Sequence, residues 1–411
     1  MTPYFVSEAQ ALQARLQQVQ PFALQMPMVT AARIDPAALK GIENLLYCGK
    51  RELESRLTSF QQQAQQRNGD PEVMQQQFAL LKLRFNALLD QLDIFADVLA
   101  QRGEHHTGVW VAGLDALVRD GIRPIADFAQ IPPLVCFLER GHGAAIRRAR
   151  TRLPGGRSNP VGVIQVPRER MISNGIASSL IHEVGHQVAA LMNFLQPLRQ
   201  QLNVRATSNP EHSTSWLLIE RWISEIMADV WAVGLLGIGA TTGLMSVVSL
   251  PRYFVFRINT DDPHPFPWIR VMISAAVGQR WYPGEQWEQL KHHWHQCYPI
   301  ERETSSKLKL LRQLETIVPE FVDMLSAFRP GSMHGRLLTD LFPLEEQQPG
   351  QLRREFQHWN GNQRLARERP PCLVFATLAQ ARFDGRLDPF REQLLLNQCL
   401  QHWAYHAATK I

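Results

Sequence analysis

Cysteine, which would allow a disulfide framework or a cysteine-rich metal site, is scarce in this sequence. The 411 residues include five cysteines, spaced too far apart for a CxxC pair or a tight cluster. An odd number of scattered cysteines predicts free thiols in a reducing compartment and argues against a disulfide-stapled fold. The five are Cys48, Cys136, Cys297, Cys372 and Cys399.

A targeting signal and a strong charge of one sign are also lacking. The N-terminal segment MTPYFVSEAQALQARLQQ has no basic start and no apolar run, so it does not read as a secretory signal. We therefore expect a cytoplasmic protein, with export by a non-classical route left open. The formal net charge is only +5, which is too small to predict nucleic acid as a partner.

Long apolar runs are limited to one segment, Val230 to Leu250, which contains no charged residue and could span a bilayer by length. Glycines interrupt it in the middle, so we expect the end of one helix, a glycine-rich turn and a second short helix in the core. A membrane span is the less favoured alternative. The glycines are Gly234, Gly237, Gly239 and Gly243.

The segment HEVGH places two histidines four residues apart, with a glutamate directly after the first. On an α-helix, His182 and His186 lie on one face and can reach one metal ion together. Glu183 lies beside that face, where it can hold and deprotonate a metal-bound water. Asn174-Gly175 is a suitable helix start, and Gly185 leaves room beside a metal at a cost in helix stability. The alternative is a helix with two surface histidines.

A catalytic zinc ion usually has three protein ligands. A third histidine on the same segment is absent, because the relevant positions hold Ala189 and Met192. The later segment RWISEIMADVWA offers Glu225 as a ligand, with Asp229 four residues on to accept the free ring N–H of a ligand histidine. This segment is otherwise very apolar, so buried acids in it need partners.

These motifs together resemble the gluzincin metallopeptidases, and they are most similar to the M48 (Ste24/HtpX-like) family. SEIMAD matches the E-x-x-A-D motif of that family, and its His-Pro pair with a following arginine is matched by His264, Pro265 and Arg270. The resemblance covers about residues 160–275, under a third of the chain.

The resemblance implies a zinc metalloendopeptidase that acts on a protein or peptide substrate and holds one zinc ion (Zn2+) per chain. The implied ligands are His182, His186 and Glu225, with Glu183 as general base. By resemblance, His264 donates to the charged oxygen of the tetrahedral intermediate and Arg270 orders the same wall of the cleft. The alternative is that His264 is only a residue of a Pro-rich turn and that Arg270 is a solvated arginine. A strand expected at Val161 to Val166 is, by resemblance, an edge strand that pairs with the substrate main chain.

The N-terminal third predicts an antiparallel helical hairpin over residues 36–102. Asp35-Pro36 starts the first helix, which can run to about Arg67, and NGDP at 68–71 separates it from the second. The second helix has a heptad seam, and each arm is about 45 Å long. The hairpin either packs on the body or serves as a partner-binding or self-association arm. The seam residues are Met74, Phe78, Leu81, Phe85, Leu88, Leu92, Phe95 and Leu99.

Residues 103–160 are expected to connect the hairpin to the core, with a strand in IPPLVCFLER. The basic segment RRARTRLPGGRSNP that follows either borders the cleft and favours acidic substrates or is a solvated loop. KHHWHQC, with His292, His293 and His295, is better explained by a surface helix than by a second metal site. Helices are expected at about 284–296, 303–326, 334–341, 349–359, 372–382 and 388–408.

We therefore expect a mainly α (α+β) protein in three regions. These are an N-terminal helical hairpin region at 1–103, a zincin-like core with a small edge sheet at 104–280, and a helical C-terminal region at 281–411. A non-catalytic zinc-binding scaffold or interaction protein that works through the hairpin is the alternative function.

Overall fold

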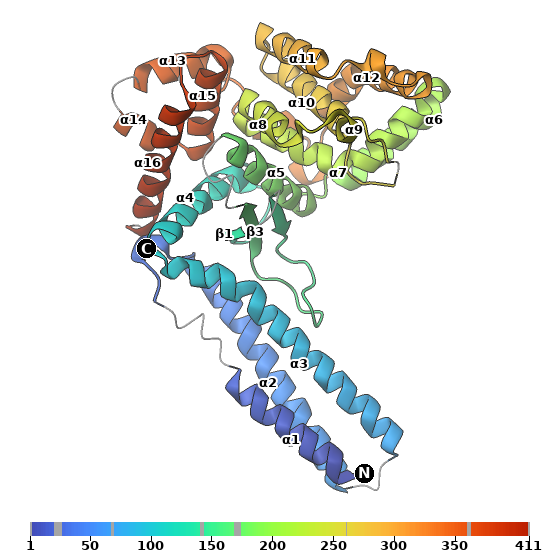
Figure 1. Cartoon of the computed structure of the whole chain (residues 1–411), viewed down its shortest axis with the longest axis vertical. Coiled ribbons are helices and arrows are strands. Elements are labelled where there is room, and N and C mark those ends of the chain that lie inside the picture. The colour runs from blue at the N-terminus through green and yellow to red at the C-terminus, as the bar shows by residue number, and fades with distance from the viewer. Residues whose placement is uncertain are drawn as a thin grey trace.

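The computed structural model describes residues 2–19, 27–66, 70–139, 144–167, 174–259, 261–359 and 363–409. Figure 1 shows a long helical arm that carries the N-terminus, joined to a helical body that contains a small sheet. The prediction of a mainly α fold with a small sheet is confirmed.

The arm contains the antiparallel hairpin expected for residues 36–102. Helix α2 spans Pro36–Gln66 and helix α3 spans Pro71–Ala100, and the two run side by side along the arm (Figure 1). Asp70 caps α3, because its side chain accepts a hydrogen bond from the backbone N–H of Glu72. The seam of α3 is buried as the heptad pattern predicts, and its outer half comprises Met74, Phe78, Leu81, Phe85 and Leu88.

A third helix, α1 (Thr2–Gln18), was not predicted and packs on both α2 and α3. Its buried residues recur at intervals of four, three and four positions, the same spacing that marks the seam of α3. The apolar spacing that predicts this helix was therefore present in the sequence. With α1, the arm is a three-helix bundle and not only a hairpin. The buried residues of α1 are Phe5, Ala9, Leu12 and Leu16.

Helix α4 (His105–Ile122) joins the arm to the body, where only connecting chain was expected. It packs against the sheet, against α5 (Asn174–Leu191) and against α16 (Pro389–Ala408), so it is buried on most sides. A helix apolar nearly all round has no amphipathic stripe, which removes the periodic signal on which a helix prediction depends.

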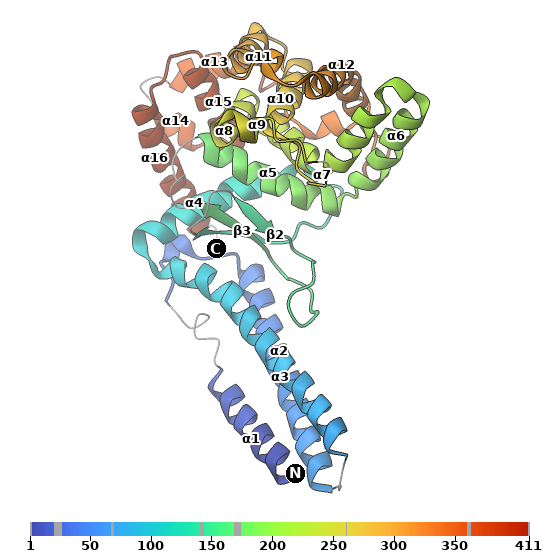
Figure 2. The ribbon, with the colours of Figure 1, turned by 45° about the vertical axis from the view of Figure 1, so that its right-hand side comes forward.

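The sheet has three strands, in the order β1 (Leu134–Glu139), β3 (Gly162–Pro167), β2 (Ala145–Arg147). Strands β1 and β3 are parallel, and β2 pairs antiparallel with β3, with Ile146 opposite Ile164. The expectation that residues 161–166 form an edge strand is wrong, because β2 covers that side of β3. Figure 2 shows the sheet between α5 and the arm.

Side chains satisfy the outer edge of β1. The backbone N–H of Cys136 donates to Asp115 (2.7 Å), and its carbonyl accepts from the buried Arg102 (2.6 Å). Gln101 donates to the carbonyl of Leu138 (2.7 Å) and accepts from its N–H (2.8 Å). Arg102 and Asp115 also pair with each other at 2.7 Å. The base of the arm is thus bonded to the sheet, which closes this edge to further strands.

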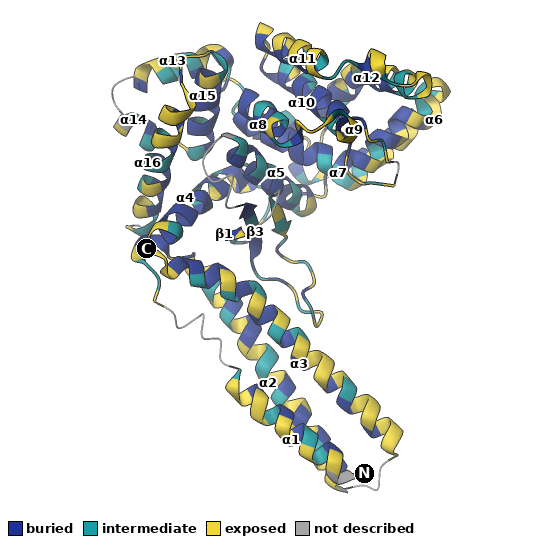
Figure 3. Ribbon diagram, viewed as in Figure 1, coloured by how far each residue is buried: buried dark blue, intermediate teal, exposed yellow. Residues whose placement is uncertain are grey.

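The body is otherwise helical. One hydrophobic core runs from Trp110 on α4 to Trp403 on α16, so the regions expected at 104–280 and 281–411 share it (Figure 3). The remaining helices are α6 (Leu195–Ser208), α7 (Ser213–Leu236), α8 (Ile238–Val248), α9 (Arg252–Val255), α10 (Pro267–Trp281), α11 (Glu285–Cys297), α12 (Ser305–Ser326), α13 (Pro349–Trp359), α14 (Gln363–Arg367) and α15 (Pro371–Phe383).

The uncharged run at 230–250 has the predicted form. Helix α7 ends at Leu236, Gly237 turns the chain with a φ of 53°, and α8 follows at once. A positive φ is readily adopted by glycine, which explains the residue at this turn. Across the described residues, no helix combines the length and the apolar character needed to cross a membrane.

Five of the six C-terminal helices lie close to their expected positions, and the sixth is wrong. Residues 334–341 form no α-helix. Short 3-10 turns occupy Gly331–Met333 and Leu338–Leu341 instead. Between them His334 and Gly335 adopt left-handed backbone conformations, with φ of 52° and 88°, which an α-helix cannot accommodate.

Candidate metal centre

The candidate site is built where α5 and α7 pack against each other in the middle of the body. Gly185 faces α7, and a Cβ there would lie 2.8 Å from the Cα of Ala228 and 2.9 Å from the Cβ of Trp231. From the sequence, Gly185 was expected to leave room beside a metal. In the structure, helix α7 occupies that space instead. Any larger residue would push the two helices apart.

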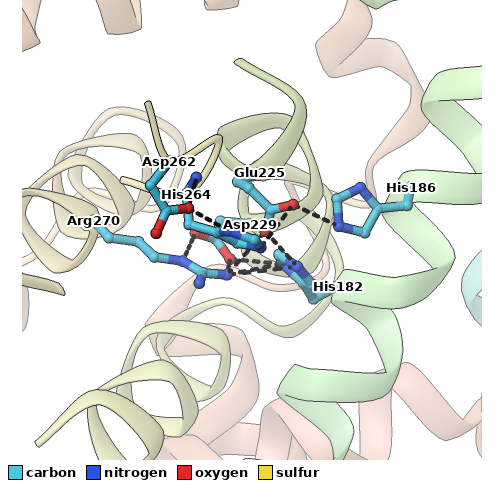
Figure 4. A network of polar contacts seen from close by, with 7 residues as sticks. All are labelled: His182, His186, Glu225, Asp229, Asp262, His264 and Arg270. Atoms are coloured by element: carbon cyan, nitrogen blue, oxygen red, sulfur yellow. Dashed lines mark hydrogen bonds and ion pairs between the residues drawn. The ribbon is translucent and has the colours of Figure 1, made fainter. Parts of the chain in front are cut away.

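This close approach brings together three potential metal ligands. Nε2 of His182 lies 3.4 Å from one carboxylate oxygen of Glu225, and Nε2 of His186 lies 3.3 Å from the other (Figure 4). Within the described residues, no other group of three His, Cys, Asp or Glu side chains places its ligand atoms as close together, within 4.8 Å.

The spacing fits a zinc ion. Bonds of about 2.0–2.2 Å in a tetrahedral arrangement hold neighbouring ligand atoms about 3.3–3.5 Å apart. The two N···O separations match this spacing, although each involves a different oxygen of Glu225, and they are longer than an ordinary charge-assisted hydrogen bond. The three ligand atoms together lie within 4.8 Å of one another, so they would have to draw closer around the ion. Two imidazole nitrogens and one carboxylate oxygen are also a donor set that zinc accepts.

Asp229 and Arg270 fix the orientation of His182. Nδ1 of His182 lies 2.7 Å from Oδ1 of Asp229, which leaves Nε2 directed at Glu225. Arg270, on α10, donates to both oxygens of Asp229, at 2.6 Å through Nε and 2.9 Å through Nη2. Such a bidentate pair holds the carboxylate in one orientation, and the carboxylate in turn holds the ring.

The two histidines have opposite electrostatic environments. Burial disfavours a charge on His182, but the adjacent Asp229 carboxylate outweighs it and raises the pKa of His182 to about 9. Burial and the nearby His182 lower the pKa of His186 to about 4. Although burial opposes its charge, the hydrogen bond and charge of His182 lower the pKa of Glu225 to about 2. Metal binding through Nε2 requires both rings to be neutral.

Glu183 is 8% exposed and lies on the sheet side of α5. Burial raises the pKa of its carboxyl group, while the backbone N–H of Ile146 on β2 donates a hydrogen bond to it. A carboxylate whose pKa is raised accepts a proton more readily near neutral pH. The contact with β2 was not predicted, because it depends on the strand order.

His264 lies on the loop before α10, with its side chain 58% exposed. Nε2 is 3.7 Å from Oε1 of Glu225, and Nδ1 is 2.8 Å from Oδ1 of Asp262. Asp262 also accepts from the backbone N–H of His264 at 2.9 Å. Sequence reasoning missed Asp262, although an Asp two residues before a histidine is a recognisable Asx-turn signal.

The three histidines of α11 do not gather around a common point. His292 contacts Gln296 at 2.8 Å, His293 contacts Cys297 at 3.7 Å, and His295 pairs with Glu315 at 3.3 Å. Each contact joins the histidine to a different partner, which is the behaviour of residues on a surface helix.

Comparison with protein-family models gives no match for this chain, and comparisons with curated proteins and with solved structures give no significant similarity.

Replacing Gly185 with alanine should move α7 away from α5. We expect the free energy of unfolding to fall by about 1–3 kcal/mol through overpacking, and zinc affinity to fall with it, because the two histidines and Glu225 lose their spacing. Urea denaturation and zinc titration against a competing chelator measure the two effects. Gly350→Ala is the matched control, since no atom lies within 4 Å of the Cβ position there. Unchanged zinc affinity in Gly185→Ala would show that the helix spacing does not set the ligand geometry.

Proposed function

We propose that the chain is a zinc-dependent endopeptidase that hydrolyses peptide bonds with Glu183 as general base. The observation that carries the proposal is the convergence of His182, His186 and Glu225 beside a buried glutamate that is not part of the ligand cluster. A structural zinc site has four protein ligands, whereas three side chains converge here among the described residues. This difference favours catalysis over the alternative of a non-catalytic scaffold.

Zinc bound by these three side chains supplies a Lewis acid that polarises a carbonyl group and lowers the pKa of a water molecule. Glu183 accepts a proton from the attacking water and delivers it to the leaving nitrogen. Its burial suits this exchange, because a raised pKa makes the carboxylate a better proton acceptor. The N–H of Ile146 holds the carboxylate in place.

Asp229 and Arg270 support the ligands without binding the substrate. Asp229 accepts from Nδ1 of His182, so that the other ring nitrogen presents its lone pair to the ligand cluster. Arg270 offsets the cost of burying the Asp229 charge, because it donates two hydrogen bonds to that carboxylate. In this proposal Arg270 is a positioning residue.

His264 is positioned to stabilise negative charge that develops on the substrate. Asp262 accepts one ring N–H, and Nε2, on the side of Glu225, offers a second N–H when the ring is protonated. A donor that faces the developing oxyanion stabilises the transition state more than the ground state. Because its side chain is 58% exposed, His264 is accessible to a peptide that binds beside the cluster.

The substrate-pairing role that the resemblance assigned to residues 161–166 belongs, in this proposal, to β2. Strand β3 is central and has a neighbour on each side, so it has no free edge for a peptide. Strand β2 has a neighbour on one side only within the described residues, and it contacts Glu183. An extended peptide can add to such an edge by main-chain hydrogen bonds. A partner-binding or self-association role for residues 36–102 stays a prediction.

The purified protein should contain about one zinc ion per chain. Elemental analysis after dialysis should show that His186→Ala loses most of this zinc, because two ligands hold the ion far more weakly than three. His292→Ala, which removes an exposed histidine of α11, is the control and should retain it. Undiminished zinc in His186→Ala would remove His186 from the ligand set.

Glu183→Gln should keep its zinc and lose about 10²- to 10⁴-fold in kcat, the usual contribution of a general base. The amide accepts no proton but is nearly the same size as the carboxyl group, so folding and zinc content should be unchanged. Both are measured as internal controls. Cleavage of a casein-derived peptide mixture, followed by mass spectrometry, measures the loss. Turnover retained together with zinc would place the proton acceptor elsewhere.

His264→Ala should lower kcat and kcat/KM together by about 10²- to 10³-fold, with normal zinc content. If His264 were a further zinc ligand, the variant would lose zinc affinity instead. If it were only a residue of the turn, neither kinetics nor zinc would change. Steady-state kinetics and elemental analysis of this one variant separate the three roles.

A further inference from the structure

The segment that follows β2 is fixed beside the metal-binding helix. The backbone N–H of Ala149 donates to the buried Gln187 on α5, the residue after His186, at 2.8 Å. Asn159 donates to the carbonyl groups of Arg147 (3.3 Å) and Arg148 (3.1 Å). These bonds hold the backbone at Arg148 in one position against the helix that carries the zinc ligands.

Among the arginines that follow Ile146, Arg148 is half-buried, whereas Arg147, Arg150 and Arg152 are exposed. Arg150 donates to the carbonyl of Gln130, and Arg157 pairs with Glu52 on the arm. Arg148 is half-buried, yet its guanidinium makes no hydrogen bond or ion pair with the described residues. A half-buried guanidinium with five donors and no acceptor among the described residues is suited to bind an acceptor from outside.

The residue after Arg148 is bonded to Gln187, the residue after His186, so the backbone at Arg148 lies close to the ligand helix. After burial and the charge of His182, the charge of Arg148 contributes to the lowered pKa of His186. The carboxylates of the site have other partners, because Glu225 faces the two histidines and Asp229 is held by Arg270. The positive charge of Arg148 is therefore available to a ligand that binds beside the metal centre.

We propose that Arg148 binds a carboxylate of the substrate, so that the enzyme prefers peptides with a negative charge close to the bond that is cleaved. This inference rests on the proposed peptidase function. A guanidinium and a carboxylate form two parallel hydrogen bonds, which gives both affinity and orientation. The carboxylate can belong to an Asp or Glu side chain or to the C-terminus of the peptide. Amidation of the C-terminus removes only the second of these two sources.

Three peptide sets of equal length separate these sources. The first contains internal acidic residues and an amidated C-terminus, the second is neutral with a free C-terminal carboxylate, and the third is neutral and amidated. Wild-type protein should cleave the first or the second set with a kcat/KM about 10- to 100-fold above the third, the range of a charge-assisted hydrogen bond. Arg148→Gln should abolish the preference, and Arg148→Lys should restore part of it.

Arg147→Gln is the matched control. Arg147 is the last residue of β2, carries the same charge as Arg148 and is exposed, whereas Arg148 is half-buried. Arg147→Gln and Arg148→Gln remove the same positive charge from neighbouring positions. Arg147→Gln should nevertheless leave the substrate preference intact, because only Arg148 is expected to bind the carboxylate. Equal cleavage of all three sets by wild-type protein, or an equal effect of the two glutamine variants, would overturn the assignment of Arg148.

Peptide binding to Glu183→Gln keeps this inference separate from the proposed function. Calorimetry with the three sets should show the same preference in Glu183→Gln and its loss in Glu183→Gln/Arg148→Gln. If the wild-type protein cleaves none of the peptides but this difference in binding is present, the peptidase proposal fails and carboxylate binding by Arg148 stands. If cleavage occurs and no preference in binding or kinetics is seen, the peptidase proposal stands and carboxylate binding by Arg148 fails. If neither cleavage nor preferential binding is seen, both fail.

Discussion

The candidate site depends on how closely α5 and α7 approach each other at Gly185. Two helices in contact through ordinary side chains have axes about 8–10 Å apart, and a glycine that meets the backbone of the next helix allows a closer approach. Here a Cβ on Gly185 would overlap Ala228 and Trp231. The ligand pair on one helix and Glu225 on the other come within zinc-binding distance only because this contact is so close.

The close contact between α5 and α7 also buries charged side chains, and each buried charge then needs a partner of opposite charge. Asp229 is buried on α7 one turn after Glu225, and an isolated buried carboxylate costs several kcal/mol. His182 and Arg270 offset this cost from two sides, at 2.7 and 2.6 Å. The helices therefore supply both the charges and the partners that make them tolerable, and the result is a preorganised set of ligands.

What could be predicted from the sequence is what local spacing determines. His182, Glu183 and His186 lie on one helix, and Glu225 with Asp229 on another, so periodicity alone identifies each pair. The heptad seam of α3 is local in the same way, and α1 carries that signal too although it was missed. The order of the strands is not local: β2 is three residues long, too short for a pattern, and it takes the edge that was assigned to β3. The positions of Ile146 and Arg148 depend on that order. The basic segment was expected to border the cleft or to be a solvated loop, but which of its residues lies beside α5 could not be assigned beforehand.

The strand that contacts Glu183 is also held from the side of the arm. Gln101 and Arg102 bond the base of the arm to β1, and β1 is joined through β3 to β2. A second connection runs through Arg157, which follows β2 in the chain and pairs with Glu52 on α2. The arm thus contacts both strand β1 and the loop between β2 and β3. These contacts fix the arm against the same small sheet whose strand β2 borders Glu183, although no residue of the arm is part of the site.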